Sequence, residues 1–553
     1  MAADSTEAMF EGSKIAEKPI FTFDKPRFLV LLLFATPSIV VLFNILYQQF
    51  NRKNYNLPPV VFHLFPFVGS AISYGKNPVK FFASCREKYG NVFTVVMLGR
   101  RLTVVLGARG NKFVLGTKSA IFNAEDAYRD FATPVFGKDV GYDVPNEVFM
   151  EQKRFLQFGL STTNFRAYVG MIEDETQHYI QTNFIFGAVN SREEWSTFDS
   201  NYVMSEIIIL TATRTLHGTE VREKLDGSVA RYYSDLDGGL GPINFLFPHL
   251  PLPSYWRRDH AQRELSKFYI SIIRKRKADT SGDFENDLMA ALIEQRYRDG
   301  TPLKEHVIAH LMIALLMAGR HTSSATASWI LIHLAANPHI ANALYAEQVQ
   351  VYRSPDNTLR PMTYDENRQL PLMNSVIRET LRIHPPIHSI MRYVRQDIAV
   401  PVVIGTPPRE IFNATDDITY VVPKGHHILA SPAISQKDPQ IWRDASSWDP
   451  YRWTDPKGVA AEAGRVYESE AAEENDTKSE YIGVGSDSPY QPFGAGGHRC
   501  IGEQFANMQL AVIIGTFIRN FELRVASIPE HNYYTTVTLP MDGYIQFRHR
   551  KID

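Results

Sequence analysis

The chain has 553 residues, of which 58 are basic and 60 are acidic, so its formal net charge is -2. This near balance gives no electrostatic reason to expect a nucleic-acid partner. Two cysteines, Cys85 and Cys500, are too few for a structural disulfide framework, which favours a reducing compartment. Because no low-complexity linker divides the chain after about residue 60, one large core is predicted.

A run of twenty uncharged residues, 28–47, lies near the N-terminus and is long enough to cross a hydrocarbon core of roughly 30 Å as a helix. A cleaved signal peptide is the alternative, but the run starts after 27 residues and lacks an Ala-x-Ala cleavage site. Five acids and four bases precede the run, whereas Arg52, Lys53, Lys76 and Lys80 follow it, so the positive side is the C-terminal side. The sequence therefore predicts a luminal segment over 1–27, a single transmembrane anchor over 28–47, a proline-containing linker over 48–70 and a cytosolic main domain over 71–553.

Hydrophobic periodicity along the main domain predicts a mainly α fold with a smaller β region. The longest predicted helix, 304–335, is apolar almost all round, so we expect it to be buried in the centre of the domain. The other predicted helices are 81–89 and 371–383. Two strands, 92–98 and 102–106, are predicted to be joined by a tight turn that contains Gly99, and further strands are predicted over 390–394, 418–422 and 428–430. Residues 455–480 carry eight acids against three bases and few apolar residues, which predicts a solvated loop without an assigned function.

The glycine-rich segment 493–502, Phe-Gly-Ala-Gly-Gly-His-Arg-Cys-Ile-Gly, ends on Cys500 and leads into a stretch compatible with a helix. Glycines allow the backbone to approach the sulfur, and a helix N-terminus with backbone N–H donors favours a thiolate over a thiol. Such a loop is typical of a cysteine that binds haem iron, with Phe493 covering the sulfur. The alternatives are a surface turn with a bystander cysteine and a phosphate-binding loop, but no Gly-Lys-Ser/Thr follows.

Two further groups of polar residues lie in predicted helices. Glu379 and Arg382 are three residues apart, and Arg452 lies between this pair and the cysteine loop; a carboxylate held by two arginines would lock that loop in place. An ordinary ion pair on a helix surface is the other interpretation of Glu379 and Arg382. In the long helix, the hydroxyls of segment 318–324 are expected to open the helix, so that His321 and Thr322 relay protons to bound oxygen. A polar kink packed against its neighbours is the alternative.

The order and spacing of the cysteine loop, Glu-x-x-Arg, the Arg452 motif and Ala-Gly-x-x-Thr resemble the cytochrome P-450 family over nearly everything after the anchor. Segment 128–143 and His321-Thr322 resemble the sterol 14α-demethylase branch, and the acidic insert after Trp453 is similar to that of its fungal members. The resemblance implies a cytochrome P-450 fold and haem b, with Cys500 as the axial ligand. It implies that the haem propionates are bound by Tyr128, Tyr142, Lys153, Arg392 and His498. It implies a substrate cavity lined by Phe136, Tyr142, Phe245, Ala314, Leu315, Ala318, His321, Thr322, Ile387, His388, Ser389 and Ile390.

The resemblance also implies the reaction. It predicts a monooxygenase of the endoplasmic reticulum membrane that removes the 14α-methyl of lanosterol or eburicol as formate in ergosterol biosynthesis, in successive oxidations that use O₂ and NADPH. Because no Gly-x-Gly-x-x-Gly dinucleotide unit is present, electrons are expected from a separate NADPH cytochrome P-450 reductase. A hydroxylase of another substrate and a haem-binding scaffold without turnover are the alternatives. The chain departs from the family at Arg320, where Gln is common, and at Gly497, where fungal members commonly have Arg.

Overall fold

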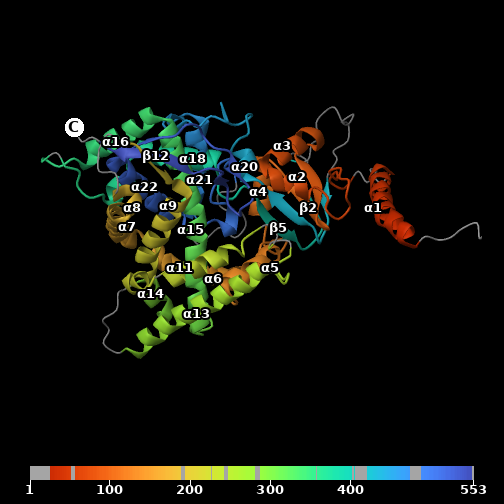
Figure 1. The fold of residues 1–553 in the computed structure, drawn as a ribbon, viewed down its shortest axis with the longest axis horizontal. Coiled ribbons are helices and arrows are strands. Elements are labelled where there is room, and N and C mark those ends of the chain that lie inside the picture. Colours follow the sequence, from red (N-terminus) through yellow and green to blue (C-terminus); the bar gives the residue numbers. More distant parts are fainter. Residues whose placement is uncertain are drawn as a thin grey trace, which may run out of the picture.

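Helices make up most of the molecule, and the longer strands gather in a smaller part of it (Figure 1). The computed structural model describes residues 25–50, 56–187, 194–225, 227–241, 244, 247–279, 287–356, 358–401, 404, 420–473 and 487–550. The helices that matter for the site are α3 (Pro78–Tyr89), α4 (Ala108–Gly116), α5 (Glu125–Phe136), α6 (Asn146–Gln157), α7 (Thr162–Thr182), α9 (Ser200–Ala212), α11 (Gly227–Asp237), α13 (Pro253–Ala278), α15 (Glu305–Ala336), α16 (Pro338–Tyr352), α18 (Pro371–Ile383), α21 (Val459–Glu473) and α22 (Glu503–Asn520). Three short 3₁₀ helices are η1 (Gly141–Asp143), η4 (Pro450–Trp453) and η5 (Gly496–His498).

Helix α15 runs through the middle of the molecule, as its apolar sequence predicts (Figure 1). It has 32 residues and ends at Asn337, where Pro338 starts α16. Helices α9, α13, α18 and α22 pack against it, so it contributes to the two largest hydrophobic clusters. α15 is one continuous α-helix through 318–324. The predicted opening of the helix there is wrong, although the Thr322 hydroxyl does donate to the carbonyl of Ala318, at 2.9 Å.

A five-stranded sheet brings together segments that are far apart in the sequence. Its strands lie in the order β1 (Val92–Met97), β2 (Arg100–Val105), β8 (His427–Ala430), β5 (Ile390–Val394) and β3 (Phe122–Asn123). The predicted hairpin is present: Met97 pairs with Arg100, and Leu98 and Gly99 between them have φ of 47° and 80°. β5 pairs antiparallel with β8, which fixes the position of Arg392 in the sheet. A second sheet has the order β4 (Ser196–Asp199), β12 (Tyr544–His549), β9 (Phe521–Arg524).

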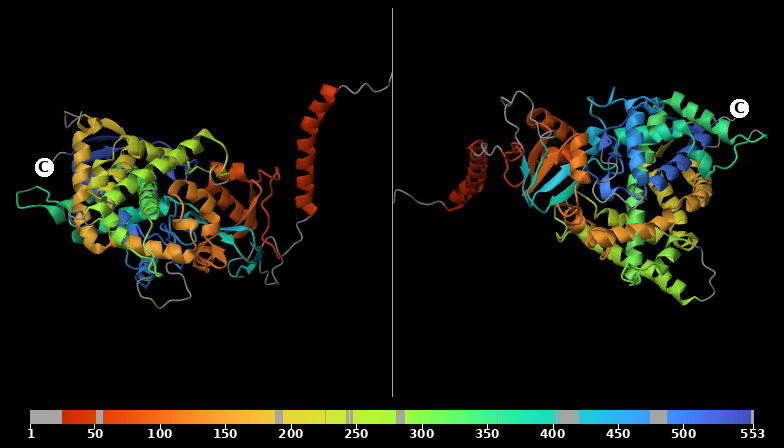
Figure 2. Two further views of the ribbon diagram at one scale, coloured as in Figure 1. Left: turned by 90° about the horizontal axis from the view of Figure 1, so that it is seen from below. Right: turned by 180° about the vertical axis from the view of Figure 1, so that it is seen from behind.

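The N-terminal helix α1 (Lys25–Phe50) stands to one side of the other elements (Figures 1 and 2). It touches the following segment through Asn44, whose amide donates to the carbonyls of His63 and Leu64 at 2.8 and 2.9 Å. The proline-containing segment is joined to the sheet from Pro59 onward, because the Pro59 carbonyl accepts from the N–H of Thr94 at 2.8 Å. Of the helices in the described part of the chain, none combines the length and the hydropathy needed to span a bilayer. The anchor over 28–47 stays a prediction.

The acidic insert differs from its prediction as a solvated loop, because residues 459–473 form helix α21. Ala460, Ala463 and Tyr467, spaced by three and four residues, are buried, whereas Glu462, Arg465 and Glu468 are exposed. This helical spacing places a narrow apolar stripe against η4. The stripe could not be predicted from composition, because the rest of the insert is rich in acids.

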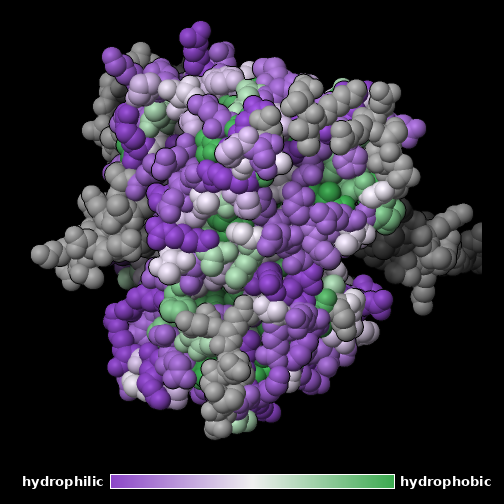
Figure 3. Space-filling view, turned by 90° about the vertical axis from the view of Figure 1, so that its left-hand side faces the viewer, coloured by the Kyte–Doolittle hydropathy of each residue, from purple (hydrophilic) through white to green (hydrophobic). Residues whose placement is uncertain are grey.

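The face of the molecule opposite α1 is dominated by hydrophilic side chains, with hydrophobic ones in small separate groups (Figure 3).

Candidate active site

The Cys500 loop is held in a conformation that requires glycine. Gly494 and Gly496 have φ of 74° and 67°, and a Cβ at Gly496 would lie 2.2 Å from the carbonyl oxygen of Leu115 in α4. The N–H of Cys500 donates to the carbonyl of Phe493 at 3.0 Å, which closes the loop. The sulfur therefore sits at the end of a tight turn, three residues before the start of α22.

Cys500 lies among closely packed protein atoms but keeps accessible surface. Its side chain has accessible surface, yet protein atoms enclose it closely enough that burial raises the pKa of the thiol. A hydrogen bond from the N–H of Gly502 lowers this pKa, Glu503 raises it, and Lys153 and Arg499 lower it. The thiol thus keeps accessible surface, with a backbone donor aimed at the sulfur as the sequence predicts.

Four of the five predicted propionate ligands form one group around this loop. The rings of Tyr128 on α5 and Tyr142 on η1 lie 5.1 Å apart, centroid to centroid. Burial raises the pKa of Tyr142 to about 12, and Tyr128 raises it further while Arg392 opposes the shift. Burial lowers the pKa of His498 to about 3, with Arg392 and then Lys153 acting in the same direction. Contacts agree with this grouping: the Tyr128 hydroxyl accepts the N–H of Met391, next to Arg392, at 2.9 Å, and the ring of Phe149 lies 5.3 Å from that of Tyr142 and 5.6 Å from that of His498. The role of these residues as ligands stays a prediction.

Lys153, the fifth of these residues, binds the loop itself. Its Nζ donates to the carbonyls of Gly497 and Arg499, at 3.1 and 3.0 Å. Helix α6 is thereby attached to the backbone on the N-terminal side of Cys500. Gly497 contributes the first of these two carbonyls, and a Cβ there would meet nothing within 4 Å.

The predicted substrate-lining residues share one property: they lie among buried segments but keep accessible surface. In α15, residues 307–313 and 323–335 are buried. In the stretch between them, Ala314, Leu315, Ala318 and Thr322 keep accessible surface. Positions 314, 318 and 322 are four apart and so lie on one face of the helix. The other lining residues that retain accessible surface are Phe136, Tyr142, Ile387, His388, Ser389 and Ile390. Helix α5 packs against both α15 and β5, which brings the lining residues of these three elements together. Phe245, the remaining predicted lining residue, lies outside the described residues.

The structure shows where Arg320 and His321 point. Both bind Asp237 at the end of α11: Nη1 of Arg320 lies 3.0 Å from one carboxylate oxygen, and Nε2 of His321 lies 2.7 Å from the other. Nε of Arg320 also donates to the hydroxyl of Ser205 on α9, at 3.1 Å. Arg320 is therefore engaged with α9 and α11, away from the accessible face of α15. Sequence reasoning missed Asp237, which no motif marks.

The expected carboxylate network is present; Glu379 and Arg382 are fully buried, and the Arg452 side chain is 13% exposed. Glu379 accepts Nη2 and Nε of Arg382 at 2.8 and 2.9 Å, and Nε of Arg452 at 3.0 Å. Trp453, which sequence reasoning missed although it follows Arg452 directly, donates its indole N–H to the same carboxylate at 3.0 Å. Nη1 of Arg382 also donates to the carbonyl of Gln436, whose side chain accepts the N–H of Gln491, two residues before Phe493. The network thus reaches the start of the Cys500 loop through one intermediate residue.

A family model described as Cytochrome P450 matches residues 58–545, which is most of the chain and includes every element of this site. The chain belongs to the cytochrome P450 family.

Individual relatives agree with this assignment. Lanosterol 14-alpha demethylase of Mycosarcoma maydis is 49% identical over 521 residues, which cover 92% of this P450 and 91% of that protein. Eburicol 14-alpha-demethylase of Uncinula necator is 44% identical over 492 residues, covering 88% of each chain. The solved structure of retinoic acid-bound cyanobacterial CYP120A1 has the same fold, with a TM-score of 0.69 at 18% identity, covering 89% of this chain and 99% of that one.

Membership of the cytochrome P450 family implies a haem with a cysteine thiolate ligand, and the residues present fit this group. Cys500 keeps accessible surface, and a metal ion deprotonates a coordinating thiol even where burial has raised its pKa. Nδ1 of His498 is buried and has no hydrogen-bond partner among the residues that the structure describes, as expected for a group that meets a ligand outside the protein chain. Cationic and phenolic donors beside it suit two carboxylates.

Proposed function

We propose that this cytochrome P450 removes the 14α-methyl group of lanosterol or a related sterol such as eburicol. The observation that carries the proposal is the identity of two-fifths to one-half, over about nine-tenths of the chain, to proteins named for this reaction. The accessible face of α15, with Ala314, Leu315, Ala318 and Thr322, supports it, because a rigid sterol requires apolar walls with few polar groups.

When bound, the haem supplies O₂ activation at its thiolate-ligated iron, and the methyl carbon passes through alcohol and aldehyde before it leaves as formate. The protein must hold the sterol with this methyl group at the iron throughout, which is a positioning task. It must also deliver protons. The Thr322 hydroxyl donates its hydrogen to the carbonyl of Ala318, and its lone pairs remain available as acceptors. When the hydroxyl rotates away from this carbonyl, it can accept a proton on the oxygen and release its own hydrogen toward the reacting oxygen.

His321 supplies the second part of the proton path. Its Nε2 lies 2.7 Å from a carboxylate oxygen of Asp237, and the two side chains are 26% and 27% exposed, so both keep accessible surface at which a proton can be taken up. An imidazole accepts a proton on one nitrogen and releases one from the other. In this proposal Asp237 and His321 bring protons to the Thr322 segment, and Arg320 holds the Asp237 carboxylate in place from the side of α9.

The substrate is tested with full-length holoprotein, a cytochrome P450 reductase, NADPH and lanosterol. The expected products are the 14-demethylated sterol and formate in equal amounts. Hydroxylated sterol without loss of the methyl group would refute the proposal and favour a different natural substrate.

The proton path is tested by Thr322→Ala. We expect intact haem binding but a fall in product formed per NADPH consumed, on the order of tenfold to a hundredfold, because general acid catalysis of that size is lost. Thr326→Ala is the matched control: its hydroxyl makes the same kind of bond, to the Thr322 carbonyl at 2.8 Å, but the residue is buried. Unchanged coupling in Thr322→Ala would remove this residue from the path.

We also propose that residues 28–47 anchor the enzyme in the endoplasmic reticulum membrane and that a separate reductase supplies electrons on the cytosolic side. Large exposed apolar side chains support membrane contact, in α1 and in segment 60–72. Alkaline carbonate should leave the full-length protein in the membrane pellet but release a variant that lacks residues 1–50. Release of the full-length protein by carbonate would contradict a spanning anchor.

A further inference from the structure

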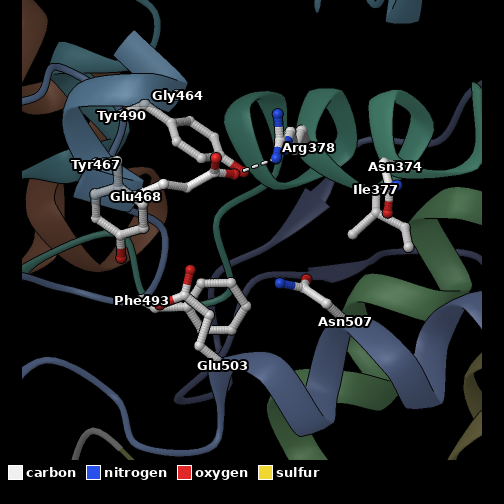
Figure 4. A pocket seen from close by; sticks show the side chains of 10 residues that line it. All are labelled: Asn374, Ile377, Arg378, Gly464, Tyr467, Glu468, Tyr490, Phe493, Glu503 and Asn507. Atoms are coloured by element: carbon white, nitrogen blue, oxygen red, sulfur yellow. Dashed lines mark hydrogen bonds and ion pairs between the residues drawn. The ribbon is translucent and has the colours of Figure 1, made fainter. Parts of the chain in front are cut away.

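Helix α21, the helix within the acidic insert, lies directly against the Cys500 loop. Tyr467 on its buried face is 2% exposed and packs with Tyr490 and Trp453 in a separate hydrophobic cluster. In Figure 4, Tyr467 lies on the same side of a small cavity as Glu503 of α22 and Phe493 of the loop. The cavity, about 70 Å³, is enclosed by α18, α21 and α22. Helix α21 of the insert therefore packs next to the Cys500 loop and lines the same cavity.

Tyr467 is bonded to two separate points of that loop. Its hydroxyl donates to the carbonyl of Gly494 at 3.0 Å. Its own backbone carbonyl accepts Nη1 of Arg499 at 2.6 Å. Gly494 lies near the start of the loop, whereas Arg499 directly precedes Cys500, so one residue of the insert fixes the loop at both ends.

The Arg499 side chain connects Tyr467 to the helix that follows the cysteine. Its guanidinium lies 3.6 Å from the centroid of the Tyr467 ring, within cation–π distance, and the side chain is 5% exposed. Its Nε donates to Glu503 in the first turn of α22 at 3.0 Å. Arg499 and Glu503 flank Cys500 in the chain, so their pairing constrains the backbone through Cys500 and the Gly502 N–H that binds the sulfur.

We propose that Tyr467 is a positioning residue for the haem thiolate: it holds Arg499 and Gly494 so that the Cys500 loop keeps the sulfur and its N–H donor in place. The proposal assigns a role to the acidic insert. It rests on Cys500 as the haem ligand and is independent of which sterol is the substrate.

We expect variants at position 467 to lose thiolate ligation faster than the wild type. Tyr467→Phe removes the bond to Gly494 and keeps the ring against Arg499, whereas Tyr467→Leu removes both. Incubating full-length holoprotein under mild heating, with samples reduced and exposed to CO, gives the rate at which the thiolate-type Soret band disappears. We expect this rate to rise about fivefold in Tyr467→Phe and about tenfold or more in Tyr467→Leu.

Arg465→Gln is the matched control, because Arg465 lies on the exposed face of α21 and binds only Glu462 and the Pro456 carbonyl among the contacts described. It should leave the rate unchanged. Arg499→Lys keeps a cation for Glu503 but loses the planar group over the ring and the Nη1 bond to the Tyr467 carbonyl, so it should raise the rate as well. Because Tyr467→Leu and Arg499→Lys both remove the contact between ring and guanidinium, the double variant should raise the rate by less than the product of the two single effects. Helical circular dichroism during the same incubation separates loss of ligation from unfolding.

Equal rates in Tyr467→Leu and Arg465→Gln would overturn the proposal, as would a double variant whose rate rises by the full product of the effects of Tyr467→Leu and Arg499→Lys. If the Soret band and the helical signal of Tyr467→Phe were lost at the same rate, Tyr467 would only stabilise the fold, and the proposal would also be overturned. If the wild type itself lacked the thiolate-type band, the assignment of Cys500 would fail instead, and the two failures are thereby distinguishable.

Discussion

Replacing Cys500 with serine is expected to abolish the thiolate-type Soret shift of the reduced CO complex completely. A serine hydroxyl is not ionised at neutral pH and cannot supply the electron density of a thiolate. The loop itself should persist, because its closing bond is between the backbone of Cys500 and Phe493. The measurement is the optical spectrum of the purified, reduced, CO-treated variant beside the wild type.

The second cysteine offers the control. Cys85 is buried in α3 within a hydrophobic cluster, so Cys85→Ala should change the spectrum little. Burial raises the pKa of Cys85 to about 11, which leaves it a neutral thiol at physiological pH. If Cys500→Ser retained the thiolate-type band, another residue would be the ligand, and the assignment of the loop would be wrong.

Glu379→Ala is expected to reduce the free energy of unfolding by about 3–5 kcal/mol, which is enough to prevent many domains from folding. Both Glu379 and Arg382 are fully buried, and the substitution leaves the Arg382 guanidinium without its counter-charge. It also removes the acceptor of the Trp453 indole and of the Arg452 guanidinium. Denaturant unfolding of the holoprotein, or soluble yield where the variant does not fold, measures the effect.

An exposed ion pair on the neighbouring helices provides the comparison. Glu468 on α21 pairs with Arg378 on α18, and both side chains are exposed, at 57% and 37%. Glu468→Gln should therefore cost less than about 1 kcal/mol. A similar cost for the two substitutions would show that the Glu379 network is not a principal support of the fold.

Sequence patterns predicted the local elements well where periodicity was strong. Helix α18 was predicted over 371–383 and has those bounds, and the β1–β2 hairpin turns at Gly99 as predicted. Both depend on local signals: prolines at the helix ends, and a glycine that accepts positive φ. α21 was missed because three apolar residues among many acids form a stripe only once the chain is helical and has a surface to cover.

In the candidate site, too, some features could be predicted from local sequence and others could not. Sequence motifs selected Cys500 and Thr322 as candidates for the chemistry and Glu379 for structural support, because the spacing within each motif is fixed along the chain. The contacts that each residue makes became known from the packing of the helices. Arg320 turns to Asp237, and Tyr467 binds Gly494 and Arg499, across separations that no local pattern encodes. The physical reason is that long-range hydrogen bonds depend on how whole helices pack, whereas motif spacing depends on the backbone of one segment.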